Sequence, residues 1–280
     1  MALGAAQQTI TTGANFIPEL WSPNVIKATE DALVMQPLLW DWSEPAKGKG
    51  DTVHVPSISN LTSNTKTANA QVTLNAPTEG VTDLAINTHI ECSFLIEDML
   101  KAQSSYNLMQ YYTEKAGFAV GKTRDTALNA LISGFSQVLG VAGTDIGDLQ
   151  IRDARELLRI ANAPAGSFKL VIHPTQENAL FGIEKYFRSD FRGDGTSSIL
   201  VNGKIGRIYD IDVFVSTNVG TSAGAYLNSL FSKECIAFAD QIGPRTQGDY
   251  ILEYLGNLVV TDHSYGQIES RDSFGVWLKS

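Results

Sequence analysis

The first part of the chain combines apolar anchors with polar residues in a pattern typical of an extended arm that carries one short helix. Ser22 and Pro23 form an N-cap and first-turn pair, apolar residues then recur at helical spacing, and Pro37 is expected to end the helix near Gln36. The same arm carries the tryptophans Trp21, Trp40 and Trp42. Such rings pack on the chain's own core or on a neighbouring molecule, and the first arrangement is the commoner one.

Two strands are predicted farther along, on either side of a long polar segment. Apolar and polar residues alternate over residues 51–58, and the alternation returns over residues 84–90. The segment between them, residues 57–82, is rich in Ser, Thr and Asn and contains one lysine and one glutamate. It holds too little apolar surface to fold alone, so it is either a disordered loop or a long hairpin that becomes ordered on another chain.

The longest helical pattern begins near Glu97. Its members step by three and four positions and are Met109, Tyr112, Ala116, Ala119, Thr123, Ala127 and Leu131. This spacing predicts one helix of about ten turns, which at the usual rise per residue spans about 50 Å. Gly117 and Gly121 lie inside it. Each costs about 1 kcal/mol relative to alanine, so they indicate a bend or a close contact of the helix.

From about residue 140 onward helices and strands alternate, and the chain ends rich in strands. Helices are predicted over residues 148–162 and 175–187, and strands over residues 168–174, 205–219, 235–241 and much of 251–279. The sequence contains no internal repeat, which excludes solenoid and propeller architectures. The whole pattern predicts an α+β fold.

Composition and charge narrow the classes of function. Of the 280 residues 43% are hydrophobic, which is ample for a sizeable core, and 21 basic against 30 acidic residues give a net charge of -9. Such an acidic chain has no general attraction for a phosphate backbone. Cys92 and Cys235 lie far apart without a CxxC spacing. This argues against a disulfide-stapled scaffold and a structural zinc site, and it fits a reducing cytoplasm.

No targeting or membrane-spanning segment is expected. The N-terminus lacks a positively charged start and an apolar stretch long enough for a signal peptide. The uncharged window over residues 126–144 is interrupted by polar residues and glycines, so a membrane span is not predicted there.

One motif suggests nucleotide chemistry. Residues 117–123, GFAVGKT, resemble a phosphate-binding loop in which Lys122 would contact the phosphates. The spacing between the glycines is one residue short, and the motif lies inside the predicted long helix, where the main-chain amides are already bonded. A plain helix face is therefore favoured, and a nucleotide hydrolase that uses Lys122 remains a remote alternative.

Other chemical candidates are weaker. No spacing places two histidines toward one metal ion, and the four are His54, His89, His173 and His263. Ser63 and Lys66 match a serine–lysine pattern without its partner motifs. Glu97 and Asp98 are predicted to diverge as neighbours on a helix, and the RGD tripeptide at residues 192–194 lies among loop glycines. No residue is assigned a catalytic, cofactor-binding or metal-binding role, and no enzymatic activity or cofactor is expected.

The order of the predicted elements resembles a known family. An extended arm, a long polar hairpin, a very long helix, an α/β module and closing strands follow one another in the major capsid proteins of tailed bacteriophages with the Hong Kong ninety-seven fold. The resemblance rests on IPELWSPNVIKATEDALVMQPLL in the arm, LQIRDARELLRIANAPAGSFKLVIHP in the α/β module and GKIGRIYDIDVFVSTNV after it. It covers nearly the whole chain.

This resemblance implies a division of the chain into five parts. They are an N-arm (residues 1–45), an E-loop hairpin (46–92), the spine helix of a peripheral domain (93–139), an axial domain (140–248) and closing strands of the peripheral domain (249–280). Some members crosslink an E-loop lysine to a neighbouring subunit, and Lys47, Lys49 and Lys66 are candidates by location alone. That chemistry is not carried over to this chain.

The resemblance also implies a function. The expected role is a structural protein that self-assembles into the icosahedral shell enclosing the genome of a tailed bacteriophage. Its expected partners are its own copies in hexamers and pentamers, a scaffolding protein, a portal protein at one vertex, a decoration protein, and packaged double-stranded DNA without sequence-specific contact, but no membrane. The expected location is the virion capsid after assembly in the bacterial host cytoplasm. An encapsulin-type shell protein, which holds cargo enzymes, is the closest alternative.

Overall fold

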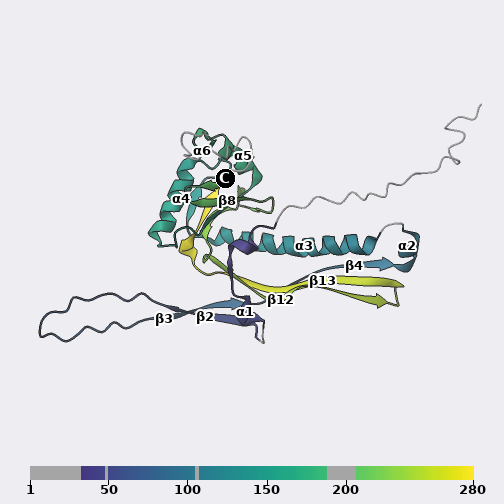
Figure 1. Ribbon diagram of the computed structural model, residues 1–280, viewed down its shortest axis with the longest axis horizontal. Helices are drawn as coiled ribbons and strands as arrows, with labels where there is room; N and C mark the ends of the chain where they lie inside the picture. The colour runs from purple at the N-terminus through teal and green to yellow at the C-terminus, as the bar shows by residue number, and fades with distance from the viewer. Residues whose placement is uncertain (1–32, 48–49, 105–106, 188–205) are drawn as a thin grey trace, which may run out of the picture.

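The computed structural model describes residues 33–47, 50–104, 107–187 and 206–280, which form an elongated molecule (Figure 1). A long hairpin projects from one end, and an α/β module lies above an extended layer of one helix and several strands. Most of the helix expected over residues 22–36 lies outside the described residues, as do Trp21, Lys49 and the RGD tripeptide.

The described chain begins with an extended segment that lies against helix α3 (Leu108–Ala130). Residues 33–35 are not helical, and Pro37 lies inside a short 3-10 helix, η2 (Gln36–Leu38), so the prediction that Pro37 ends a helix was wrong. Proline fits there because the first turn of a helix leaves its main-chain N–H groups without acceptors. The main-chain N–H of Met35 donates to Asp125 Oδ1 at 2.8 Å, which fixes the segment on α3.

The long polar segment forms the outer part of a hairpin. A hairpin was one of the two structures expected for it, the other being a disordered loop. Strand β2 (Thr52–Ile58) pairs antiparallel with β3 (Glu79–Ala85). The strand predicted over residues 84–90 is in fact two strands, because β3 ends at Ala85 and β4 (Thr88–Glu97) pairs with a different partner. Period-two alternation continues across the junction, so the pattern alone does not reveal the change of partner.

The spine of the molecule is shorter than predicted. In place of one helix of about ten turns there are α2 (Asp98–Gln103), α3 with 23 residues, and a closing 3-10 turn η3 (Leu131–Gly134). At the usual rise, α3 spans about 35 Å. It starts anew at Asn107, whose side chain caps the helix by accepting from the N–H of Gln110. Glu97 ends β4 while Asp98 begins α2, so this pair does not lie on one helix as expected.

The buried face of α3 also differs from the predicted one. Its buried residues are Ala116, Val120, Arg124, Asp125, Leu128 and Asn129, whereas Ala119 and Thr123 are exposed. The sequence pattern favoured small and apolar residues, but Arg124 is buried against Asp240 of β12, and Asp125 is buried where it accepts from the N–H of Met35 and from Asn218 Nδ2. The close contact expected at a glycine occurs at Gly121, where a Cβ atom would lie 2.5 Å from Leu33 Cδ1.

A four-stranded sheet lies under α3 in the order β1-β12-β13-β4. It joins β1 (Trp40–Asp41), β12 (Ile236–Ile251), β13 (Gly256–Glu269) and β4. One face packs against α3, as the rings of Phe94 and Tyr112 show with centroids 5.7 Å apart. The opposite face is not covered by α3, and we call it the open face of the sheet (Figure 1).

The α/β module is a six-stranded sheet in the order β5-β14-β11-β6-β8-β7. Its strands are β5 (Val138–Gly140), β6 (Phe168–Ile172), β7 (Arg207–Ile208), β8 (Ile211–Val215), β11 (Asn228–Ser232) and β14 (Gly275–Lys279). The helices are α4 (Asp148–Ile160), α5 (Pro174–Phe181) and α6 (Glu184–Phe187), near the predicted positions. Ile151, Leu158 and Leu170 are fully buried in its core. A small hairpin of β9 (Thr221–Ser222) and β10 (Ala225–Tyr226) lies before β11.

The boundary expected between residues 248 and 249 does not separate two structural units. It falls inside β12, which belongs to the four-stranded sheet from Ile236 onward. The last strand, β14, follows the 3-10 turn η4 (Asp272–Phe274) and returns to the six-stranded sheet between β5 and β11. Sequence order cannot show this, because strand pairing is decided by contacts between distant parts of the chain.

Candidate assembly surfaces

The root of the hairpin is fixed to the open face of the four-stranded sheet. A small apolar cluster holds it there, made of Trp42, Ala46, Val53, Leu84, Ala237 and Ala239. Trp42 follows β1 and packs its ring edge-on to Trp40 at a centroid distance of 5.2 Å. Both described tryptophans of the arm therefore pack on the chain's own core, the alternative that was favoured.

Close main-chain contact reinforces this root. A Cβ atom on Gly266 of β13 would lie 2.3 Å from the carbonyl oxygen of Ala85, so only glycine allows β3 to approach the sheet so closely. The amide of Gln241 donates to the carbonyl of Gly50 at 2.7 Å. Helix α1 (Ser43–Ala46) lies beside the root, and the Ser43 hydroxyl accepts from the N–H of Asp240 at 3.0 Å.

The outer part of the hairpin has no core of its own. Its two arms are held together by polar bonds, including Asn64 Nδ2 to Asn75 Oδ1 at 3.0 Å and the N–H of Ser59 to the carbonyl of Thr78 at 3.2 Å. Asn69 has a positive φ of 61° and forms the turn. Five large apolar side chains along the hairpin are exposed to solvent, namely Ile58, Leu61, Val72, Leu74 and Val81. Several large apolar side chains exposed on one projecting element are a mark of an interaction surface.

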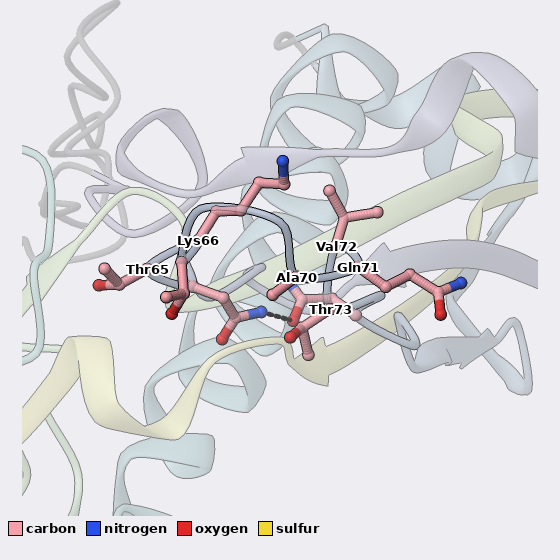
Figure 2. Close-up of a pocket in the computed structure, with 9 residues that line it drawn as sticks. Thr65, Lys66, Ala70, Gln71, Val72 and Thr73 are labelled. Carbon is pink, nitrogen blue, oxygen red and sulfur yellow. Dashed lines mark hydrogen bonds between the residues drawn. The ribbon is translucent and has the colours of Figure 1, made fainter.

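The tip encloses a shallow hollow of about 290 Å³ lined mainly by polar residues. Figure 2 shows the Lys66 ammonium on the outside of this loop, away from the dashed hydrogen bond that joins its two arms. Ser63 and Lys66 thus lie in an exposed tip that contains no histidine or carboxylate to activate a nucleophile.

A second concave surface lies on the open face of the four-stranded sheet. It is a groove of about 620 Å³ across β4, β13 and β12. Leu258 and Val260 form its half-buried apolar floor, while Glu91 and Asp249 are exposed carboxylates at its sides. We call it the sheet groove.

One end of the sheet groove is held by a charged network. Asp262 is only 8% exposed and receives two bonds from Arg245, from Nε at 2.9 Å and from Nη2 at 3.0 Å. His89 Nε2 lies 3.0 Å from the other oxygen. The hydrogen bonds from Arg245 and His89 lower the pKa of the Asp262 carboxyl to about 2, so this carboxylate is already paired within the chain.

The junction between α3 and the four-stranded sheet holds a buried ion pair. Arg124 is 3% exposed, and its guanidinium lies 4.7 Å from the centroid of the Phe238 ring and 5.5 Å from that of Tyr265. Burial lowers the pKa of Arg124 from its usual range, and Asp240 beside it offsets part of that shift. Sequence reasoning missed this pair, because a charged residue in a helical pattern normally indicates the solvent face.

A third exposed apolar group lies at the turn between β12 and β13. Leu252, Tyr254 and Leu255 are all more than 60% exposed there. Leu255 adopts a positive φ of 44°, a conformation that glycine or asparagine usually supplies. A turn built from large apolar residues presents side chains for contact with another molecule.

The chemical candidates from the sequence are not brought together. Lys122 is exposed in the middle of α3, so residues 117–123 form a helix face and not a phosphate-binding loop. In the described ranges no group of three His, Cys, Asp or Glu side chains could hold a metal ion. Cys92 and Cys235 are both free thiols. Among the helices that the structure describes, none is long and apolar enough to cross a membrane.

The four histidines have local structural partners. His54 and His89 contact Asp83 and Asp262, at 2.6 and 3.0 Å. His173 caps α5, and His263 is buried with Nε2 3.3 Å from Asp240. His54, His89 and His263 thus join neighbouring strands, and His173 caps the start of α5.

Comparisons with known proteins agree with this geometry. The family model of phage capsid proteins matches residues 94–277. A solved structure from Mycobacterium phage Che8 is 24% identical, with 94% of this chain and 97% of that chain covered and a TM-score of 0.81. The capsid structure of cyanophage P-SCSP1u is 16% identical, with 96% of this chain and 94% of that chain covered and a TM-score of 0.80. A structure from Gordonia phage Cozz is 14% identical, with 100% of this chain and 97% of that chain covered and a TM-score of 0.74. No curated protein sequence matches.

An elongated chain with a projecting hairpin, a long helix over a long sheet and an α/β module has the fold of tailed-phage capsid proteins of the Hong Kong ninety-seven type. The chain belongs to the phage capsid protein family, and it is a structural major capsid protein of the virion. The family favours this role over the encapsulin and nucleotide hydrolase alternatives.

Proposed function

We propose that this protein assembles through its hairpin into hexamers and pentamers, and from these into a closed icosahedral shell around the genome of a tailed phage. The observation that carries this proposal is the hairpin itself, which is fixed at its root by a buried cluster and exposes apolar side chains beyond it. A monomer in water leaves these side chains solvated, whereas a neighbouring subunit can bury them.

The parts of the subunit take the following roles in this proposal. The segment before β2 is the N-arm, and the hairpin β2–β3 is the E-loop. The four-stranded sheet with α2 and α3 is the peripheral domain, with α3 as its spine helix. The six-stranded sheet with α4, α5 and α6 is the axial domain. Because β14 returns to the six-stranded sheet, the closing part of the peripheral domain is β12 and β13 alone.

The proposed partners are those expected of a capsid shell protein. A separate scaffolding protein guides assembly in the host cytoplasm, a portal protein replaces subunits at one vertex, and a decoration protein binds the outer surface. Double-stranded DNA fills the shell without sequence-specific contact. The net charge of -9 supports this last point, since a wall that binds few phosphates does not hold back DNA that moves past it.

We further propose that the protein catalyses no reaction. His54, His89 and His263 contact carboxylates and join neighbouring strands, and Lys122 is a solvated charge on α3.

Electron microscopy and sedimentation of the purified protein test the proposal. The protein alone or with its scaffolding partner is expected to form pentamers, hexamers or closed particles. A strict monomer at high concentration in the presence of the scaffolding protein contradicts it.

A further inference from the structure

The α/β module is joined to the layer formed by α3 and the four-stranded sheet at one junction. In the described ranges the chain crosses it from η3 to β5, from β11 to β12, and from β13 through η4 to β14. These crossings are bonded to one another. The N–H groups of Ser270 and Arg271 donate to the carbonyl of Cys235 at 2.8 and 3.1 Å, and the N–H of Ser136 donates to Asp272 Oδ1 at 2.8 Å. A movement of the module against the layer therefore has to change this junction.

Two carboxyl groups lie against each other at this junction. Glu269 is the last residue of β13, Asp272 is the first residue of η4, and their side chains are hydrogen-bonded to each other. Such a bond needs a proton on one of the two, because an ionised carboxylate only accepts. The N–H and the hydroxyl of Ser136 both donate to Asp272. Asp272 is therefore the carboxylate, and the proton lies on Glu269.

The other elements that meet at this pair bring no cation to it. From η3, a Cβ atom on Gly134 would lie 3.2 Å from Glu269 Oε2, so main chain packs against the carboxyl group. The connection from β11 to β12 brings the Cys235 thiol. Burial, and then the charges of the two carboxyl groups, raise the pKa of this thiol, which is therefore neutral. Arg271 is paired with Glu234, with Nη1 3.2 Å from Oε2.

These surroundings explain how the proton is held. Burial, and then the hydrogen bond to Asp272 and its negative charge, raise the pKa of Glu269 from 4.5 to about 7. Burial opposes ionisation of Asp272 as well, but the bonds from Ser136 outweigh it and lower the pKa of that carboxyl. The two groups thus titrate far apart, and the pair shares one proton in weakly acidic solution.

We propose that the Glu269–Asp272 pair is a proton-dependent latch between the α/β module and the layer formed by α3 and the four-stranded sheet. With its proton in place, the pair joins the end of β13 to η4, and the bonds from Ser136 extend the link to the segment that follows α3. When the proton passes to water, two carboxylates face each other and repel. The junction then opens more often.

The latch acts on a junction that apolar packing also holds. Phe135, Cys235 and Phe274 are buried in one core that runs through it, and a Cβ atom on Gly275 would lie 2.5 Å from the ring of Phe135. Loss of the proton therefore does not separate the module from the layer. It raises the fraction of molecules in which the three crossings are locally open while the sheets on either side stay folded.

Proton linkage sets the size of this effect. In the open form Glu269 faces water and has its ordinary pKa of 4.5, whereas in the closed form its pKa is about 7. Between these pH values the closed form holds a proton that the open form has lost, so a rise in pH favours the open form. For these two values the open fraction rises about tenfold between pH 6 and pH 8.5.

Hydrogen exchange of the unassembled full-length subunit tests the latch. Exchange rates are divided by the intrinsic rate at each pH, and the amides of Ser136, Ser270 and Arg271 report the junction. Their protection is expected to fall about tenfold from pH 6 to pH 8.5, while the amide of Leu170, in the core strand β6, keeps its protection.

Three substitutions separate the latch from other effects of pH. In Glu269→Gln the amide donates to Asp272 at every pH, so the fall in protection is expected to disappear. Asp272→Asn removes the carboxylate that helps to hold the proton, so the fall is expected to move to lower pH. Glu156→Gln changes an exposed carboxyl group on α4 and is the matched control, with the fall of the wild type. Circular dichroism confirms that each variant is folded.

The outcomes decide the proposal in either direction. Loss of the fall in Glu269→Gln, or its shift to lower pH in Asp272→Asn, with the control unchanged, supports the latch. A wild type without the fall, or the same fall in the wild type and both junction variants, overturns it. An equal fall at Leu170 also overturns it, because the pair then affects the whole fold and not the junction. The measurement uses free subunits, so it does not depend on whether the protein forms shells.

Discussion

Arg124 Nη2 lies 2.6 Å from Asp240 Oδ1, across the interface between α3 and β12. The arginine is almost fully buried, and the rings of Phe238 and Tyr265 lie against its guanidinium. Asp240 also lies beside the buried His263. The pair joins α3 to the sheet that carries both the hairpin root and the sheet groove.

Removal of one partner of this pair leaves a buried charge without compensation. Asp240→Ala is therefore expected to lower the free energy of unfolding by about 3 to 5 kcal/mol. Chemical denaturation of the unassembled subunit measures the change. Lys122→Met removes an exposed charge from the same helix and is the matched control, with a change of only tenths of a kcal/mol. Equal effects of the two substitutions contradict the role of the ion pair.

The free energy of unfolding is expected to fall as the pH rises from about 4.5 to just above 7. The cause is the carboxyl group of Glu269, at the end of β13. Burial first, and then the hydrogen-bonded carboxyl of Asp272, raise the pKa of Glu269 to about 7 from its ordinary value of 4.5. In this window the folded state holds a proton that the unfolded chain has lost, so each rise in pH favours unfolding. Melting temperatures measured from pH 5 to 8.5 should fall less for Glu269→Gln than for the wild type. Glu156→Gln, an exposed change on α4, should leave the slope unaltered.

Limited proteolysis compares the hairpin tip in free and assembled protein. In the free subunit Lys66 is exposed in a tip without apolar packing, so trypsin is expected to cut there first and release a C-terminal fragment that begins at Thr67. In the shell a neighbour covers the tip, and this cut should slow by orders of magnitude. Lys66→Gln removes the site and identifies the fragment. Similar cutting rates in the two samples indicate that the tip makes no stable contact between subunits.

Lys122→Ala is expected to leave assembly nearly intact and to remove no enzymatic turnover. The lysine is an exposed charge in the middle of α3, so its loss changes stability by only tenths of a kcal/mol. Particle yield and ATP hydrolysis by the purified protein are the measurements. ATP hydrolysis that is lost on this substitution would instead support a nucleotide hydrolase.

Gly266→Ala is expected to displace the hairpin root. The new methyl group would lie 2.3 Å from the carbonyl oxygen of Ala85, and such overpacking costs about 1 to 3 kcal/mol. Gly117→Ala is the matched control, since a methyl group there would meet no atom within 4 Å and alanine should stabilise α3 by up to about 1 kcal/mol. Thermal unfolding distinguishes the two. A stabilised Gly266→Ala variant contradicts the close approach of β3 to the sheet.

The sequence by itself determined the order and kind of most elements. Alternation marked β2, and the 3.6-residue period marked α3 and α4. For the polar segment with few large apolar residues the sequence left two alternatives, a disordered loop and a long hairpin that becomes ordered on another chain. These features are set by residues that lie close together in the sequence, so the spacing of apolar and polar residues predicts them directly. The resemblance to a capsid protein followed from that order and is confirmed by the family match.

The tertiary structure alone decided which strands pair and which charges are buried. Alternation continued through Ile86, although β3 and β4 belong to different sheets. The strand β14 returns to the six-stranded sheet, and Arg124 points into the molecule because Asp240, 116 positions later, lies beneath it. The sheet groove likewise joins Glu91 to Asp249 from strands far apart in sequence. Each of these depends on contacts between distant segments, and the spacing of residues along one segment carries no information about its partner.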